Sequence, residues 1–173
     1  MKEIVVIGAG RIGATIADMA SQSGDYSVTV VDRSAEALAA LDTDAKVKTA
    51  RCEVAEPVDG VDARIARIAE AAAAAKVHYF DLTEDVKSTR RVKEIAGKAE
   101  TAFIPQCGLA PGFIAIAAMS LAKKFDTLDT VAMKVGALPQ FPTNVLNYAL
   151  TWSPEGVINE YCEPCEAIVD GKM

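Results

Sequence analysis

Residues 1–13 read MKEIVVIGAGRIG, and this stretch decides the fold. The β-branched run at residues 4–7 predicts a short strand buried on both faces. Three glycines follow at G-x-G-x-x-G spacing, each with its own role. Gly8 allows a tight turn, Gly10 removes a side chain where phosphate approaches, and Gly13 lets a helix pack close to the strand. The pattern predicts a cradle for the pyrophosphate of a dinucleotide.

The helix that follows the turn is expected over residues 11–22. The backbone N–H groups at its start, including those of Arg11 and Ile12, have no partner within the helix. These groups and the helix dipole favour an anion at this end. Arg11 and Ile12 are therefore predicted to contact the cofactor together with the three glycines.

A second strand is expected over residues 27–31 and ends beside Asp32, 19 residues after Gly13. A carboxylate at this place accepts hydrogen bonds from the hydroxyl groups of the adenosine ribose. It also repels a 2′-phosphate, so NAD is favoured over NADP. Arg33 keeps NADP as the alternative, because a neighbouring arginine accommodates that phosphate. A glycine turn in a fold that binds no dinucleotide is the competing interpretation.

The whole chain limits the classes of protein to consider. Its 173 residues suffice for one domain, or for one domain and a fragment of another. A net charge of −6 without a basic stripe speaks against a nucleic-acid partner. No apolar run approaches the ~20 residues of a membrane span, and the N-terminus carries no secretory pattern. We expect a cytoplasmic protein whose four cysteines stay reduced.

Strands and helices alternate along the first two thirds of the chain. Ser34 is expected to cap a helix that runs to Leu41. The further expected elements are a strand over 46–51, a helix over 63–76, a strand over 77–82, a helix over 84–99 and a strand over 101–104. This alternation predicts an α/β fold, a Rossmann-type doubly wound parallel sheet with helices on both faces.

The character of the sequence changes after Pro105. A loop over 106–112, a helix over 113–123 and a strand over 128–135 are expected, followed by a tail rich in loops. We divide the chain into a dinucleotide-binding domain at 1–125 and the beginning of a second, α+β domain at 126–173.

Three segments resemble the saccharopine dehydrogenase family, in particular its lysine 6-dehydrogenase-like branch. They are HYFDLTEDV (78–86), PQCGLAPGF (105–113) and GALPQFPTNVLNYALTWSPEGVINEYCEPCEAIVDGK (136–172). The resemblance implies an N-terminal Rossmann domain and a C-terminal catalytic and oligomerisation domain. It also implies NAD(P)-dependent oxidation at a carbon–nitrogen bond of an amino acid.

The chain departs from that family in two places. Family members carry a further strand and a proline-containing loop near the nicotinamide, between the third strand and the alanine-rich helix, whereas here residues 61 and 62 run almost directly into the helix expected over 63–76. The chain also ends at residue 173, early in the expected second domain. These departures support an alternative, a non-catalytic dinucleotide-sensing module or cofactor-binding remnant.

Polar residues follow the strand expected over 77–82. Asp81 ends it, Thr83 is expected to act as the N-cap of the next helix, and Glu84 suits the positive end of that helix. Ligands bind at the carboxyl ends of strands in open α/β sheets. Asp81 is therefore a candidate catalytic residue and Glu84 a candidate substrate contact. His78 is better interpreted as a strand-start residue than as a catalytic group.

Cys107 follows the next strand end and is the second candidate catalytic residue, although a buried small thiol is the simpler interpretation. Gly112 begins a helix whose N-terminus is expected to bind the carboxylate of an amino acid. Trp152 is a candidate substrate contact or, alternatively, a packing anchor, ahead of a turn expected at 154–156. The C-x-x-C pair Cys162 and Cys165 lacks the further ligands of a zinc site, so no metal is expected.

The combined prediction is an NAD-dependent oxidoreductase that acts on the carbon–nitrogen bond of lysine or a lysine-derived amine. Its partner is then a small amino acid. A homo-oligomer is also expected, because the tail carries apolar residues that need a covering surface. These are Val145, Leu146, Tyr148, Leu150 and Trp152.

Overall fold

The computed structural model of the protein describes residues 1–41, 47–54, 61–136, 140, 141, 145, 147, 154–162, 164 and 168–172. The side chains of residues 61, 62, 155, 159 and 160 are excepted. The chain forms two compact units, Met1–Asp59 and Gly60–Met173. The expected division into domains at 1–125 and 126–173 stays a prediction.

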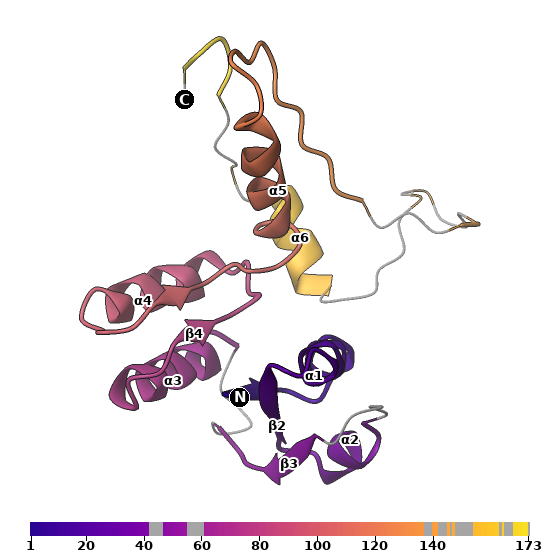
Figure 1. Cartoon of the computed structure of the whole chain (residues 1–173), viewed down its shortest axis with the longest axis vertical. Coiled ribbons are helices and arrows are strands. Elements are labelled where there is room, and N and C mark those ends of the chain that lie inside the picture. Colours follow the sequence, from indigo (N-terminus) through magenta and orange to yellow (C-terminus); the bar gives the residue numbers. More distant parts are fainter. Residues whose placement is uncertain are drawn as a thin grey trace. The chain divides into compact units, whose positions relative to one another are not determined.

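The first unit alternates strands and helices as expected (Figure 1). Its elements are β1 (Lys2–Ile7), α1 (Arg11–Gln22), β2 (Tyr26–Asp32), α2 (Ala35–Ala39) and β3 (Lys48–Arg51). The three strands are parallel and stand in the order β1-β2-β3. Ser34 caps α2 as predicted, because its Oγ accepts a hydrogen bond from the Ala37 N–H at 3.1 Å.

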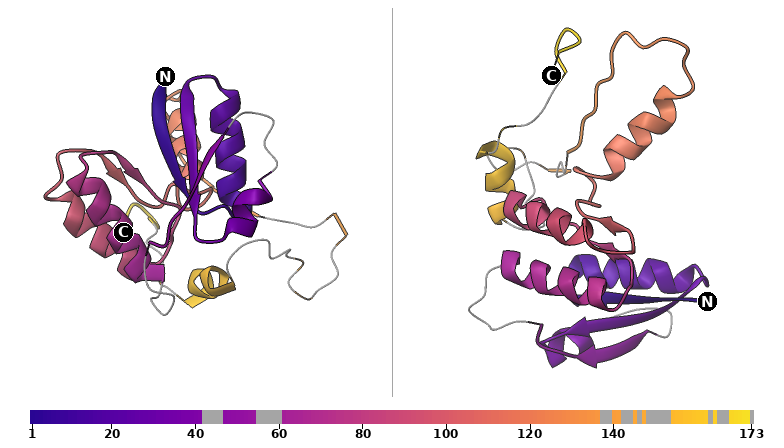
Figure 2. Two further views of the ribbon diagram at one scale, coloured as in Figure 1. Left: turned by 90° about the horizontal axis from the view of Figure 1, so that it is seen from below. Right: turned by 90° about the vertical axis from the view of Figure 1, so that its left-hand side faces the viewer.

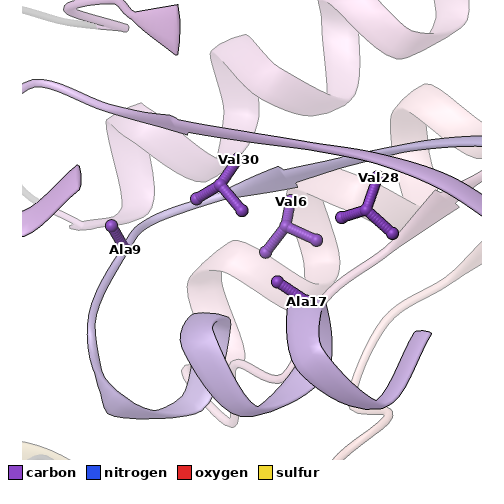
Figure 3. Packing of buried hydrophobic residues seen from close by; sticks show 5 residues of the cluster. All are labelled: Val6, Ala9, Ala17, Val28 and Val30. Atoms are coloured by element: carbon purple, nitrogen blue, oxygen red, sulfur yellow. The ribbon is translucent and has the colours of Figure 1, made fainter. Parts of the chain in front are cut away.

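One face of this sheet carries the core of the first unit (Figure 3). Val6, Val28 and Val30 point from the strands toward Ala17 of α1, and α2 packs against the same cluster. Right-handed crossovers that run in one direction along a sheet place their helices on the same face. The expectation that β1 is buried on both faces was therefore wrong: Val5 is 61% exposed and Ile7 is 45% exposed.

In its described residues the second unit contains a short parallel pair of strands and four helices. Its elements are α3 (Val61–Ala74), β4 (Tyr79–Phe80), α4 (Val86–Ala96), β5 (Phe103–Ile104), α5 (Phe113–Ala122) and α6 (Pro154–Cys162). Helices α3 and α4 lie side by side in both views of Figure 2. Their core includes Ala69, Tyr79 and Val92, and the Tyr79 ring stacks on Phe103 with centroids 5.3 Å apart.

Several expected elements differ in this unit. The strand expected over 128–135 was wrong: these residues form no strand and their side chains are exposed, since no described strand pairs with them. The turn expected at 154–156 is instead the first turn of α6, where proline is well tolerated. The strand expected over 77–82 is reduced to β4, because the Val77 N–H donates back to Ala72 at the end of α3.

The α/β class with parallel strands is thus confirmed. The described strands belong to two sheets, β1-β2-β3 and β4-β5, rather than to the single sheet that was expected.

Candidate functional site

The glycine turn between β1 and α1 has the geometry that the spacing predicted. Gly8 has φ of +107°, a conformation that side chains rarely adopt, and its N–H donates to the carbonyl oxygen of Val31 at 2.8 Å. The turn is therefore attached to the neighbouring strand β2 at its first residue.

Gly13 and Gly10 are required for different reasons. A Cβ on Gly13 would overlap the carbonyl oxygen of Gly8 and lie 3.0 Å from its carbonyl carbon. Gly13 is thus required by the packing of α1 against the turn. A Cβ on Gly10 would meet nothing within 4 Å. The chain itself leaves that space open, which suits a group bound from outside.

The start of α1 presents backbone donors. Gly10 is the N-cap, without a side-chain capping hydrogen bond, and the first turn carries no acidic residue. Arg11 and Ile12 are the first two helical residues and both are exposed. Their N–H groups lie at the positive end of the helix, a suitable place for a phosphate.

Asp32 connects the glycine turn to the end of β2. Its Oδ2 accepts a hydrogen bond from the Ala9 N–H at 2.7 Å, and its Oδ1 accepts one from the Ser34 N–H at 2.8 Å. These two hydrogen bonds, that from Ala9 first, lower the pKa of Asp32 from its ordinary value of 3.8. Each carboxylate oxygen retains a further lone pair for a ribose hydroxyl. Sequence reasoning missed the hydrogen bond from Ala9, which is fixed only when the turn folds back onto β2.

Acid is expected to weaken the hydrogen bonds that Asp32 accepts from the Ala9 and Ser34 N–H groups. A folded-state pKa below 3.8 means that ionised Asp32 adds stability above that pH, and the stability is lost as the pH falls through the lowered pKa. We expect Asp32→Asn to lower the free energy of unfolding by about 1 kcal/mol near neutral pH. Thermal unfolding of both proteins from about pH 7 to about pH 2 should show the difference shrinking in acid. A difference independent of pH would contradict this role for the charge.

Two arginines flank Asp32. Arg33 follows it in sequence, as predicted, and is exposed. Arg51, at the end of β3, stands opposite Asp32 in the parallel register. Sequence reasoning missed Arg51, although a basic residue at the end of the third expected strand was a usable signal.

A second polar cluster lies at the carboxyl ends of β4 and β5. Asp81 Oδ1 accepts hydrogen bonds from the N–H groups of Thr83, at 3.0 Å, and Gln106, at 3.2 Å. The Cys107 N–H donates to the Asp81 carbonyl oxygen at 2.8 Å. The fold thus brings together the two residues predicted as catalytic, Asp81 and Cys107.

The other carboxylate oxygen of Asp81 is in a buried position, and the Tyr79 hydroxyl neighbours this carboxylate. Its Oδ2 is buried and has no hydrogen-bond partner in the part of the chain that the structure describes. Most buried acceptors in proteins have a partner, so an oxygen without one has capacity for a ligand donor. Burial first, and then a hydrogen bond and the negative charge of the Asp81 side chain, raise the pKa of the Tyr79 hydroxyl, which therefore stays protonated as a neighbour of that carboxylate.

Cys107 has the surroundings of a neutral thiol. Its Sγ donates to the Ile104 carbonyl oxygen at 3.0 Å. Burial and, to a smaller extent, the Asp81 carboxylate raise the pKa of this thiol. Since the thiolate is the nucleophilic form, these surroundings favour a structural cysteine over a nucleophile.

The remaining predicted residues are distributed around this cluster. Glu84 is half-buried between β4 and α4, and Asp85, rather than Thr83 as expected, caps α4 through its hydrogen bond from Ser88 at 2.7 Å. His78 Nδ1 accepts a hydrogen bond from the Ala102 N–H at 3.1 Å, which is a structural role. Trp152 lies outside the described residues.

Gly112 caps α5 in a tight backbone arrangement. Its φ is +133°, and a Cβ there would overlap the carbonyl oxygen of Gly108. The Phe113 and Ile114 N–H groups at the start of α5 already donate to the carbonyl oxygens of Gly108 and Leu109. A substrate carboxylate at this helix end would have to displace those bonds.

The described ranges contain no cluster of metal ligands and no membrane-spanning helix. No group of three or more His, Cys, Asp or Glu residues there is arranged to hold a metal ion. None of the described helices is long and apolar enough to cross a membrane. Cys162 is free and exposed, and Cys165 lies outside the described residues.

Comparison with known proteins gives two matching family models. The Saccharopine dehydrogenase NADP binding domain matches residues 4–63, and the Saccharopine dehydrogenase C-terminal domain matches residues 108–173. The first match contains the glycine turn, Asp32 and both arginines. The second contains α5 and α6 and begins just after Cys107.

Two individual proteins are also similar. The mitochondrial alpha-aminoadipic semialdehyde synthase of Rattus norvegicus is 20% identical over an alignment of length 193, which covers 99% of this chain and 21% of that protein. The apo histidine-tagged saccharopine dehydrogenase (L-Glu forming) from Saccharomyces cerevisiae has a similar fold, with a TM-score of 0.59 and 19% identity. That match covers 91% of this chain and 40% of the yeast chain. The chain thus spans about a fifth of the length of the rat relative.

Proposed function

Because the chain belongs to the saccharopine dehydrogenase family, we propose that it binds a pyridine nucleotide and serves the oxidation of a carbon–nitrogen bond. The substrate that we propose is lysine or a lysine-derived amine such as saccharopine, acted on by a lysine 6-dehydrogenase-like enzyme. The single observation that carries the cofactor proposal is the open space at Gly10, beside a helix start without a capping side chain.

The residues of the first unit fit a dinucleotide. The N–H groups of Arg11 and Ile12 would hold the pyrophosphate, and Gly10 leaves room for it. Asp32 retains lone pairs for the ribose hydroxyls, which supports NAD. The matching family model is described as NADP binding, so NADP is the second candidate.

Asp81 is our candidate for handling the substrate amine. Bound NAD(P) supplies the hydride acceptor for an amine oxidation. The buried Oδ2 of Asp81 can accept a hydrogen bond from the substrate ammonium and take a proton from its nitrogen. We assign Cys107 a supporting role, since its N–H and its thiol both bond to backbone carbonyl oxygens. Glu84, Gly112 and Trp152 stay predictions as substrate contacts.

A second candidate is a dinucleotide-binding protein without catalysis. The observation that favours it is the short connection between β3, which ends at Arg51, and α3, which begins at Val61. Turnover distinguishes the two: a catalytic protein reduces its nucleotide in the presence of lysine or saccharopine, whereas a sensor only binds it.

Self-association and cellular location also stay predictions. Val145 is 98% exposed, whereas the other four apolar tail residues named for a homo-oligomer lie outside the described residues. The rat relative is described as mitochondrial, and a cytoplasmic location for this chain stays a prediction.

Calorimetric titration with NAD and, separately, NADP tests the cofactor proposal. We expect the wild-type chain to bind at least one of them, and Gly10→Ala to weaken binding by about tenfold or more because its Cβ fills the phosphate space. Gly10 has φ of −71°, which alanine adopts freely, so the variant should stay folded. Failure of the wild-type chain to bind either nucleotide would overturn the proposal.

A further inference from the structure

The loop after β5 directs two consecutive backbone N–H groups at one residue. The Gln106 N–H donates to Asp81 Oδ1 at 3.2 Å, and the Cys107 N–H donates to the Asp81 carbonyl oxygen at 2.8 Å. In an extended strand, consecutive N–H groups point in opposite directions. Both groups can therefore reach Asp81 only because the chain leaves the extended conformation between them, at Gln106.

The backbone of Gln106 is in an unusual conformation. Its φ is +60°, in the left-handed region that residues other than glycine rarely adopt. Asparagine and aspartate enter this region with the help of a local side-chain hydrogen bond. Within the described residues the half-buried Gln106 side chain makes no hydrogen bond to the protein. The backbone hydrogen bonds to Asp81 therefore hold the conformation, and strain that is held in this way clusters at functional sites.

The two oxygens of the Asp81 carboxylate are made unequal by this arrangement. Oδ1 accepts the N–H groups of Thr83, at 3.0 Å, and of Gln106, at 3.2 Å. The buried Oδ2 accepts no hydrogen bond from the described residues. Two donors on one oxygen restrict the rotation of the carboxylate, so Oδ2 keeps one direction. A proton acceptor is more effective when its orientation is fixed before the substrate binds.

We propose that Gln106 is a positioning residue for Asp81. The left-handed conformation of its backbone, rather than its side-chain amide, aims the N–H group that holds Oδ1 and leaves Oδ2 for the substrate nitrogen. This inference rests on the proposed amine oxidation with Asp81 as the proton acceptor. It adds a residue that acts through Asp81 and needs no contact of its own with the substrate.

Steady-state turnover of lysine or saccharopine, with NAD or NADP, tests this assignment on the wild-type chain, Gln106→Gly and Gln106→Val. Both replacements remove the side-chain amide and keep the N–H group. Glycine adopts the left-handed conformation freely, whereas the β-branched valine disfavours it. We expect kcat of Gln106→Val to fall by about tenfold or more, with KM within about threefold because no substrate contact is lost. Gln106→Gly should keep kcat within about threefold of wild type.

Lys76→Val is the matched control, because Lys76 is a second left-handed residue of the same unit, with φ of +53°. Lys76 precedes β4, whereas Asp81 follows that strand. Its ion pair with Glu100 is exposed, so the loss of this pair has little effect. We expect kcat of Lys76→Val to stay close to wild type. In an Asp81→Asn background, Gln106→Val should leave the residual kcat unchanged, because the two residues act as a unit.

The outcomes separate this inference from the proposed function. Wild-type kcat in Gln106→Val overturns the role of Gln106, and so does an equal loss in Gln106→Gly, which would assign the effect to the side-chain amide. An equal loss in Lys76→Val shows a general effect of backbone strain and also overturns it. So does an unfolded Gln106→Val, detected by hydrogen exchange of the α4 amides, because position 106 would then hold the whole unit together. A wild-type chain that oxidises neither amine overturns the proposed oxidation itself, and the inference with it.

Discussion

Gly13→Ala is expected to destabilise the first unit by about 3 kcal/mol or more. Its Cβ would overlap the carbonyl oxygen of Gly8 and approach the Gly8 carbonyl carbon at 3.0 Å. Both are backbone atoms, and the Gly8 N–H is hydrogen bonded to Val31, so the turn cannot move without losing contacts. Val6 Cγ1 lies 3.5 Å from the same position, and Val6 belongs to the buried cluster. A methyl group at position 13 would therefore also press on Val6 in the buried cluster.

Gly10→Ala is the matched control, because the same methyl group in the same turn meets open space. We expect it to cost about 1 kcal/mol or less, since alanine is a poorer N-cap than glycine. Hydrogen exchange of the β2 amides measures the stability of the first unit, and the α4 amides serve as an internal reference. Equal exchange of the β2 amides in the two variants would contradict the packing role of Gly13.

Asp81→Asn is expected to abolish most turnover of lysine or saccharopine, by about 10²- to 10⁴-fold. The asparagine oxygen can replace Oδ1 and keep the hydrogen bonds from Thr83 and Gln106. The amide nitrogen then takes the place of the unpartnered Oδ2, where it can no longer accept a proton. The variant thus removes the proposed chemistry and leaves the loop in place.

Two further variants complete this test. Asp81→Ala removes both loop hydrogen bonds, leaves two donors without their acceptor and should cost about 1–3 kcal/mol in stability, unlike Asp81→Asn. Cys107→Ser retains a donor toward Ile104 and should keep turnover close to wild type, because burial raises the pKa of the thiol and so disfavours the nucleophilic thiolate. Full turnover by Asp81→Asn would contradict the proposed role of Asp81 as proton acceptor. A strong loss of turnover in Cys107→Ser would instead support a catalytic role for Cys107.

The elements around the glycine turn could be predicted because their causes are local. The bounds of α1 and the cap of α2 at Ser34 agree with the expectations from sequence. Hydrogen bonds within a helix or a turn connect residues a few positions apart, so nearby sequence contains the information. The strand expected over 128–135 failed for the opposite reason. A strand needs a partner, and apolar alternation does not reveal whether one is present.

The candidate site was predictable in part for the same reason. Asp81 and Cys107 were each selected because they follow an expected strand, and parallel strands bring their carboxyl ends to one edge. Their hydrogen-bonded contact follows from that rule. The availability of Asp81 Oδ2 and the raised pKa of the Cys107 thiol do not follow from it, because both depend on burial by the folded loop.

The sequence by itself determined the α/β class, the glycine turn and the position of Asp32 at the end of the second strand, because spacing and side-chain type suffice for these. Only the tertiary structure decided that α1 and α2 share one face of the sheet, since the direction of the crossovers is a property of strand order. It also decided that Ala9 donates to Asp32 and that Arg51 stands opposite that carboxylate. These contacts join residues that are distant in sequence, and they form only when parallel strands come into register.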